Sequence, residues 1–152
     1  MDRVLGIDPG LTGGCAVYCT ATRQVISAID IPVVGEAAKR RVNAMALRDW
    51  IKQTRPNAAY IERAQAMPDQ GASSGFIYGR AVGALEGIVQ CMDVPLTVIE
   101  STAWKKFHNL RGGSKEDSRQ RALQVVPGAI NLLARKLDHG RAEAILIAVY
   151  GA

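Results

Sequence analysis

RVLGIDPGLTGG, residues 3–14, is the stretch that decides the fold of this chain. Its first part is aliphatic, which is typical of a buried β-strand. The strand ends in a carboxylate, Asp8, and the backbone must then turn at Pro9 and Gly10. Asp8 could serve there only as a turn former. However, burying an unpaired carboxylate costs several kcal/mol, so an acid at the end of a buried strand usually has a charged partner or a metal ion.

The chain on either side of this turn shows an α/β rhythm. Segments 13–20 and 24–31 are predicted to follow residues 3–8 as the second and third strands of an antiparallel meander. Further strands are predicted at 58–62 and 96–100, and helices at 42–55, 72–92, 114–125 and 138–150. A basic loop is expected at 32–41, and a short aromatic and basic segment at 101–113. This order predicts a mixed α/β fold, a five-stranded sheet flanked by helices.

Composition sets the class of protein. With 152 residues, 48% of them hydrophobic, the chain is expected to form one domain over 1–152 with a genuine core. Its apolar stretches are far shorter than a membrane span and no signal peptide is apparent, so we expect a soluble protein of the cytoplasm. Three cysteines fit neither a disulfide framework nor a zinc site. A net charge of +5 favours a polyanionic partner without identifying it.

Acidic residues suggest a metal site. Asp8 and Glu62 both end predicted strands, and the two carboxylates converge if those strands are neighbours. Asp138, His139 and Glu143 stand at the start of the final helix, where residues four apart share a face. Oxygen ligands, with one imidazole, suit Mg²⁺ or Mn²⁺ far better than zinc. Two such ions can activate a water and stabilise the leaving oxygen of a phosphodiester.

Each acid also has an ordinary explanation. Glu62 could pair with Arg63 or Arg80, Asp138 could be a helix N-cap, and Glu143 could lie on a solvated face. Taken together these explanations are less satisfactory, because the acids recur at two strand ends and one helix start in a basic protein. The combination favours a metal site.

Longer stretches carry a family resemblance. GIDPGLTGGCAVY, AYIERA, GFIYGRAVGALEGI, STAWKKF, SKEDSRQRALQVVP and DHGRAEAILIAVYG occur in this order over nearly the whole chain. Together they resemble the RuvC family of Holliday junction resolvases, and most closely its short phage or prophage members. The resemblance implies an RNase H-like fold, a homodimer, two divalent metal ions (Mg²⁺ or Mn²⁺), and paired nicks placed symmetrically across a four-way DNA junction.

The resemblance also assigns roles to single residues. Asp8, Glu62 and Glu143 match three of the family's acidic ligands. Gly140 occupies the usual place of the fourth, which leaves Asp138 and His139 as candidates. The family's lysines near the scissile phosphate fall at Lys105 or Lys106 and at Lys115. The implied catalytic set is therefore Asp8, Glu62, Asp138, His139, Glu143 and Lys115. The family's aromatic wedge after the strand-four glutamate is absent, and Gln65 and Met67 stand there instead.

Basic residues between the fifth strand and the last helix are candidates for DNA contact. They are Lys105, Lys106, Arg111, Lys115, Arg119 and Arg121. Such a group can track phosphates, which carry little sequence information, so recognition of branched shape is expected. The alternative is an ordinary solvated face. Trp104 and Phe107 could stack on bases, although an apolar pair beside a strand is more often part of the core.

Glycines recur at every fourth position of the helix predicted at 72–92. Gly75, Gly79, Gly83 and Gly87 share one face, and a glycine inside a helix costs about 1 kcal/mol relative to alanine. Close approach of another backbone would explain them. That backbone could belong to the chain's own sheet or to the same helix of a second copy, as the resemblance implies.

The expected function is a metal-dependent endonuclease that cleaves Holliday junctions or related branched DNA. Three alternatives remain open at this point. The chain could be another RNase H-like nuclease acting on forks, flaps or structured RNA. It could be a catalytically silent DNA-binding module. The stretch GIDPGLTGG also resembles the phosphate loop of the actin and sugar-kinase superfamily, but proteins of that class have two related domains and are normally much longer.

Overall fold

The computed structural model describes residues 2–66, 68–110 and 112–152. Its centre is a five-stranded sheet in the order β3-β2-β1-β6-β7. The strands are β1 (Arg3–Asp8), β2 (Gly14–Cys19), β3 (Gln24–Asp30), β6 (Ala58–Glu62) and β7 (Leu96–Ile99). β1, β2 and β3 are antiparallel, whereas β6 runs parallel to β1 and β7 parallel to β6. The predicted five-stranded mixed sheet is confirmed.

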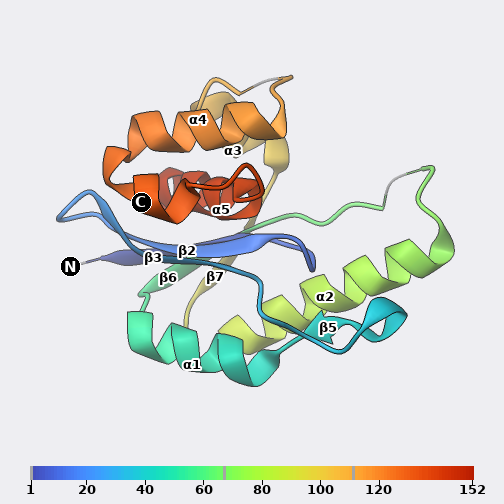
Figure 1. The fold of residues 1–152 in the computed structure, drawn as a ribbon. Coiled ribbons are helices and arrows are strands. Elements are labelled where there is room, and N and C mark those ends of the chain that lie inside the picture. The colour runs from blue at the N-terminus through green and yellow to red at the C-terminus, as the bar shows by residue number, and fades with distance from the viewer. Residues whose placement is uncertain (1, 67, 111) are drawn as a thin grey trace.

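Helices cover both faces of this sheet, as Figure 1 shows. One face carries α1 (Ala44–Thr54) and α2 (Ala72–Gln90). The other carries α3 (Ser101–Phe107), α4 (Lys115–Val125) and α5 (His139–Gly151). Within the described residues, no helix is both long enough and apolar enough to cross a membrane.

Two hydrophobic cores lie on opposite sides of the sheet. Leu5 and Ile7 of β1 are fully buried in the core beneath α1 and α2, together with Cys15 of β2. The other core lies beneath α3, α4 and α5 and contains Trp104 and the aliphatic face of α5. Because helices cover both faces of β1, this strand is almost continuously apolar, as expected for a central strand. All three cysteines are free thiols.

Three segments differ from the sequence prediction. The expected loop at 32–41 contains part of a small ribbon of β4 (Val33–Val34) and β5 (Arg41–Val42), with the 3₁₀-helix η1 (Ala37–Lys39) between them. The aromatic segment after β7 begins with helix α3. A second 3₁₀-helix, η2 (Pro127–Leu133), precedes α5. These elements are too short to show a full helical or strand period in the sequence.

Helix α5 packs its backbone directly against β1 and β2. A Cβ atom at Gly6 would collide with the carbonyl of Ala144 and lie 2.5 Å from the backbone nitrogen of Ala148. A Cβ atom at Gly14 would lie 2.6 Å from the backbone of Gly140. Glycine is therefore required on the strands so that α5 can approach them. This contact determines how closely Glu143 of α5 approaches Asp8 at the end of β1.

Candidate active site

Three carboxylates meet at one edge of the sheet. Ile7 of β1 is paired with Ile61 of β6 in parallel register, so Asp8 and Glu62 follow at the same end of neighbouring strands. Helix α5 adds Glu143 from above the strands. Burial, and then the charges of Glu143 and Glu62, raise the pKa of Asp8 well above its usual value. The three acids therefore lie close enough to repel one another.

Two of these carboxylates are held by neutral donors. The Nε1–H group of Trp104 donates to Oε2 of Glu62 at 2.7 Å, and the hydroxyl of Ser118 donates to Oε1 of Glu143 at 3.1 Å. Trp104 is completely buried, as expected if the pair Trp104 and Phe107 belonged to the core, but Phe107 is 60% exposed, so that interpretation was wrong for Phe107. Its hydrogen bond to Glu62 was not foreseen, and neither was Ser118. Each bond engages one carboxylate oxygen and fixes the orientation of the other.

Lysines from two helices approach the acids. The charges of Lys105 on α3 and Lys115 on α4 both lower the pKa of Asp8, and Lys105 also acts on Glu62. The ammonium group of Lys105 lies 5.2 Å from the centre of the Trp104 ring. The acidic edge therefore combines carboxylates that could hold cations with lysines that could contact a phosphate.

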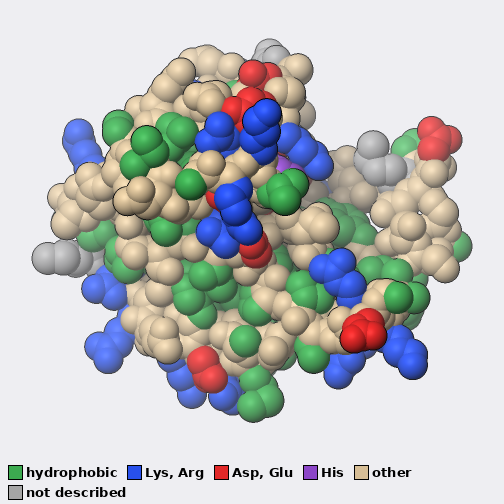
Figure 2. All heavy atoms as spheres, viewed as in Figure 1, with side chains coloured by type: hydrophobic (Ala, Val, Ile, Leu, Met, Phe, Trp, Pro, Cys, Tyr) green, Lys and Arg blue, Asp and Glu red, His purple; other side chains and the backbone are tan. Residues whose placement is uncertain are grey.

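The other predicted basic contacts differ in their surroundings. Lys106 is exposed, and Arg111 lies outside the described residues. Arg119 donates to both carboxylate oxygens of Glu116 and to the backbone carbonyl of Leu133. These bonds tie α4 to η2, so Arg119 has a structural role. Figure 2 shows Lys and Arg side chains spread over one face of the molecule and around its rim.

Asp138 belongs to an ion-pair network with Arg135 and Arg141. It is only 2% exposed and accepts hydrogen bonds from the backbone and the guanidinium of Arg135, at 2.8 and 2.6 Å. Burial acts to raise its pKa, but the hydrogen bonds from Arg135 outweigh burial and hold the pKa below the usual value. Asp138 directly precedes α5, where its side chain makes no capping bond to the helix, so it does not act as the side-chain N-cap that the ordinary explanation supposed.

His139 faces a different hollow. This hollow, of about 350 Å³, is also lined by Thr12, Asp30 and Arg40, and lies beyond the turn that follows β1. The residues whose charges shift the pKa of Asp8 are Glu143, Glu62, Lys105 and Lys115, and His139 is not among them.

Gly140 explains the missing fourth acid. It lies one turn before Glu143 on α5, where the family resemblance expects a ligand. A Cβ atom at this position would lie 2.8 Å from the carbonyl carbon of Gly13 and 2.9 Å from the backbone oxygen of Thr12. A side chain cannot fit there while α5 keeps its contact with the β1–β2 turn.

Of the two ordinary partners considered for Glu62, Arg63 is engaged elsewhere. Arg63 forms an ion pair with Glu100, and Arg80 lines a separate hollow with Leu11 and Arg40. Next to Glu62 lies an open hollow of about 480 Å³, lined by Glu62, Arg63, Gln65, Gln70, Tyr78, Ser101 and Lys105. The ring of Tyr78 lies against the turn at Gly10. This hollow adjoins the acidic edge through Glu62 and Lys105.

The acidic edge suits a divalent cation by its chemistry. In the part of the chain that the structure describes, no three His, Cys, Asp or Glu side chains form a preformed metal cage. The three carboxylates nevertheless offer the hard oxygen donors that Mg²⁺ and Mn²⁺ prefer. Their burial and mutual repulsion are unfavourable for the chain alone, and a bound cation would relieve both. The donor set therefore fits such an ion, with adjustment of the side chains.

The sheet order and flanking helices define an RNase H-like fold of the RuvC type. Solved structures that share it include the following three. RuvC of T. thermophilus in complex with a Holliday junction substrate superposes with a TM-score of 0.71 at 19% identity, covering 99% of this chain and 92% of that one. Another structure of Thermus thermophilus RuvC gives 0.64 at 20% identity, covering 97% and 92%. The yeast mitochondrial Holliday junction resolvase Ydc2 gives 0.64 at 16% identity, covering 98% and 77%.

No family model matches the sequence, and no curated protein matches it. At these identities the structural likeness establishes the fold. The activity must be argued from the residues of this chain.

Proposed function

We propose that this protein is a metal-dependent endonuclease that hydrolyses phosphodiesters in branched DNA, with the four-way junction as its preferred substrate. The observation that carries the proposal is the convergence of Asp8, Glu62 and Glu143 beside two lysines. This arrangement occurs in a fold shared with a RuvC structure that holds a Holliday junction substrate. The 152 residues would act as one nuclease domain.

Each residue at the acidic edge has a task in this mechanism. Asp8, Glu62 and Glu143 would hold Mg²⁺ or Mn²⁺, which when bound supplies water activation and charge neutralisation at the leaving oxygen. Trp104 and Ser118 orient two of the acids through their hydrogen bonds. Lys105 and Lys115 would bind the non-bridging oxygens of the phosphate as negative charge develops on them. Because both donors are neutral, they orient these acids without placing a competing positive charge beside the cation.

We assign Asp138 to structural support and not to metal binding. Its carboxylate is committed to Arg135, and Arg135 also bonds to Asp30 of β3. This network fixes the segment before α5 against the edge of the sheet. His139 remains the candidate for a fourth ligand, and it would have to turn from its hollow toward the acidic edge.

The glycine face of α2 supports a homodimer. Among the described residues, no atom lies within 4 Å of a Cβ atom built at Gly79, Gly83 or Gly87. Packing on the chain's own sheet therefore does not account for these glycines. Gly83 and Gly87 border an apolar groove of about 500 Å³ between α1 and α2, and Met45 at its rim is 67% exposed. A second copy of α2 would fill this groove, and a two-fold dimer would present two active sites for two symmetric nicks.

The dimer has a direct test. Gly83→Gln places a long side chain on the open face, where a single copy has room for it at the Cβ position. Sedimentation should give a dimeric mass for the wild type and a monomeric mass for this variant. Gln53→Ala, at an exposed position of α1, serves as the control and should remain dimeric. A monomeric wild type would refute the dimer.

The activity is tested with a labelled immobile four-way junction, a fork, a flap and a linear duplex, each with Mg²⁺, Mn²⁺ or EDTA. We expect paired symmetric nicks in the junction that require the metal. Asp8→Asn should abolish them and keep or strengthen junction binding, because a negative charge facing phosphate is removed. Equal cutting of forks and flaps would indicate a general branch nuclease. Binding without cutting in either metal would indicate the silent module.

A further inference from the structure

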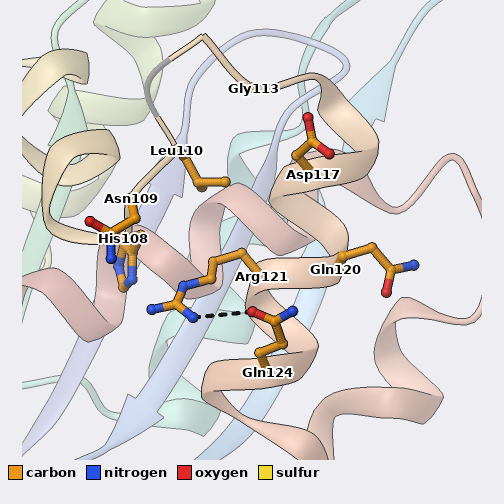
Figure 3. Close-up of a pocket in the computed structure, with 8 residues that line it drawn as sticks. All are labelled: His108, Asn109, Leu110, Gly113, Asp117, Gln120, Arg121 and Gln124. Atoms are coloured by element: carbon orange, nitrogen blue, oxygen red, sulfur yellow. Dashed lines mark hydrogen bonds between the residues drawn. The ribbon is translucent and has the colours of Figure 1, made fainter.

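A further hollow lies where α3 meets α4, on a part of α4 that the proposed active site does not use. It has a volume of about 360 Å³. Figure 3 shows the side chains that surround it, which are His108, Asn109, Leu110, Gly113, Asp117, Gln120, Arg121 and Gln124. The hollow is large enough for a phosphate group together with part of its nucleotide.

The guanidinium of Arg121 is the main charge in this hollow. Nη1 of Arg121 donates to Oε1 of Gln124 at 3.1 Å, a bond to a neutral group (Figure 3). Its Nε atom is enclosed and has no hydrogen-bond partner among the described residues. The salt bridges formed within the described ranges do not include Arg121. The charge of this guanidinium is therefore not neutralised by an acid of the described residues, and an anion in the hollow would offset it through the outer N–H groups of Arg121.

Arg119, two residues earlier on the same helix, provides the contrast. Its guanidinium is bonded to the Glu116 carboxylate and to the carbonyl of Leu133. Both arginines were candidates for DNA contact in the sequence. The structure satisfies Arg119 internally and leaves the charge of Arg121 without an acidic partner among the described residues.

The groups around Arg121 can accept an anion. His108 is buried, and one ring nitrogen, Nε2, bonds the carbonyl of Leu146 at 2.8 Å. Burial lowers the pKa of His108 and the nearby charge of Arg121 lowers it further, against the opposite effect of the bond to Leu146, which disfavours a second positive charge in the hollow. Among the described lining residues Asp117 is the one acid. Its carboxylate accepts the backbone N–H of Ser114 at the start of α4, where the helix dipole offsets a negative charge.

The position of the hollow relates it to the active site. Helix α4 carries Lys115 and Ser118 at the acidic edge, and Arg121 lies one turn beyond Ser118 on the same helix. We propose that this hollow is a second phosphate site, in which Arg121 binds a backbone phosphodiester of a junction arm away from the scissile position. The inference depends on the proposed function, because the anion is a phosphate of the DNA that the active site cuts.

The test is the salt dependence of junction binding. In the Asp8→Asn protein without divalent metal, the dissociation constant for the four-way junction is measured between about 50 and 200 mM salt. Arg121→Gln should weaken binding several-fold and reduce the slope of log K against log salt by about 1, the loss of one phosphate contact. Arg121→Lys should restore most of the slope. Lys52→Gln, in the last turn of α1 and on the opposite face of the sheet, should leave it unchanged.

A second variant guards against a folding defect. Gln124→Glu would neutralise Arg121 from within, since Gln124 already accepts its Nη1–H, and it should reduce the slope as Arg121→Gln does. If both variants keep the wild-type slope, the phosphate site is wrong and the nuclease proposal stands. If the Asp8→Asn parent does not bind the junction at all, the proposed function itself fails.

Discussion

Replacing Gly79, Gly83 and Gly87 with alanine should stabilise a single copy of this protein. All three lie inside α2, where alanine is favoured over glycine by about 1 kcal/mol per residue. No atom of the described residues would lie within 4 Å of the new methyl groups, so a single copy gains helix propensity without a clash. The sum is about 3 kcal/mol. For a chain of this size it corresponds to a rise in Tm of about 6–12 °C.

The same methyl groups should weaken a dimer that packs α2 against α2. The assay is thermal unfolding followed by circular dichroism at two protein concentrations, with sedimentation to give the mass. The wild-type Tm should rise with concentration, because association stabilises the folded state by mass action. The triple variant should be largely monomeric, and its Tm should not depend on concentration.

Gly6→Ala provides a control of opposite sign. Its Cβ atom would collide with the backbone of Ala144, so this variant should be strongly destabilised although it also replaces glycine with alanine. If the triple variant is less stable than the wild-type monomer, the glycine positions of α2 are not open in a single copy, and the reasoning is refuted. A triple variant that stays dimeric with unchanged affinity would show that the glycines lie outside the interface.

The remaining predictions concern the active site. Trp104→Phe removes the donor to Glu62 and keeps an aromatic ring in the core, so single-turnover cleavage should fall about 10- to 100-fold and require more Mg²⁺. Asp138→Asn should lower the free energy of unfolding by about 1–3 kcal/mol and leave the metal dependence of cleavage unchanged; a shifted Mg²⁺ requirement would return Asp138 to the metal site. His139→Ala should slow cleavage and raise the Mg²⁺ requirement if this residue is the fourth ligand, and an unchanged metal titration would exclude it. Gly140→Asp restores the acid expected from the resemblance, but it should lower the Tm and not speed cleavage, because Gly13 leaves no room for its Cβ atom.

The sequence predicted the strands of the sheet and the meeting of Asp8 with Glu62. Both acids end apolar runs, and period and composition are local signals. The convergence also required β1 and β6 to be neighbours, which the order of elements made the natural arrangement. The partners of these acids could not be predicted in the same way. The bond from Trp104 to Glu62 joins residues 42 positions apart, and nothing in the local pattern distinguishes a core tryptophan that donates to an acid from one that does not.

The start of α5 shows why a one-dimensional pattern is ambiguous here. Asp138, His139 and Glu143 are close in sequence and are equally plausible as ligands by residue type. In the structure, Arg135, which follows η2, donates a hydrogen bond to Asp138, whereas Ser118 of α4 donates one to Glu143. Asp138 and Glu143 therefore differ in role because their partners come from different earlier elements of the chain. The spacing of the two acids in the sequence does not reveal this difference.

The depth of α5 on the sheet determines which of its positions can serve the site. Glycines at 6 and 14 let the helix backbone touch the strands, and this contact brings position 143 over the end of β1. The same contact leaves no space for a side chain at position 140. Close packing and an acid one turn earlier are thus mutually exclusive in this chain. A fourth ligand could be regained only by moving α5 outward, which would withdraw Glu143 from Asp8, or by using His139 from the adjacent position. The metal titration of His139→Ala therefore tests how the packing of one helix limits the composition of the site.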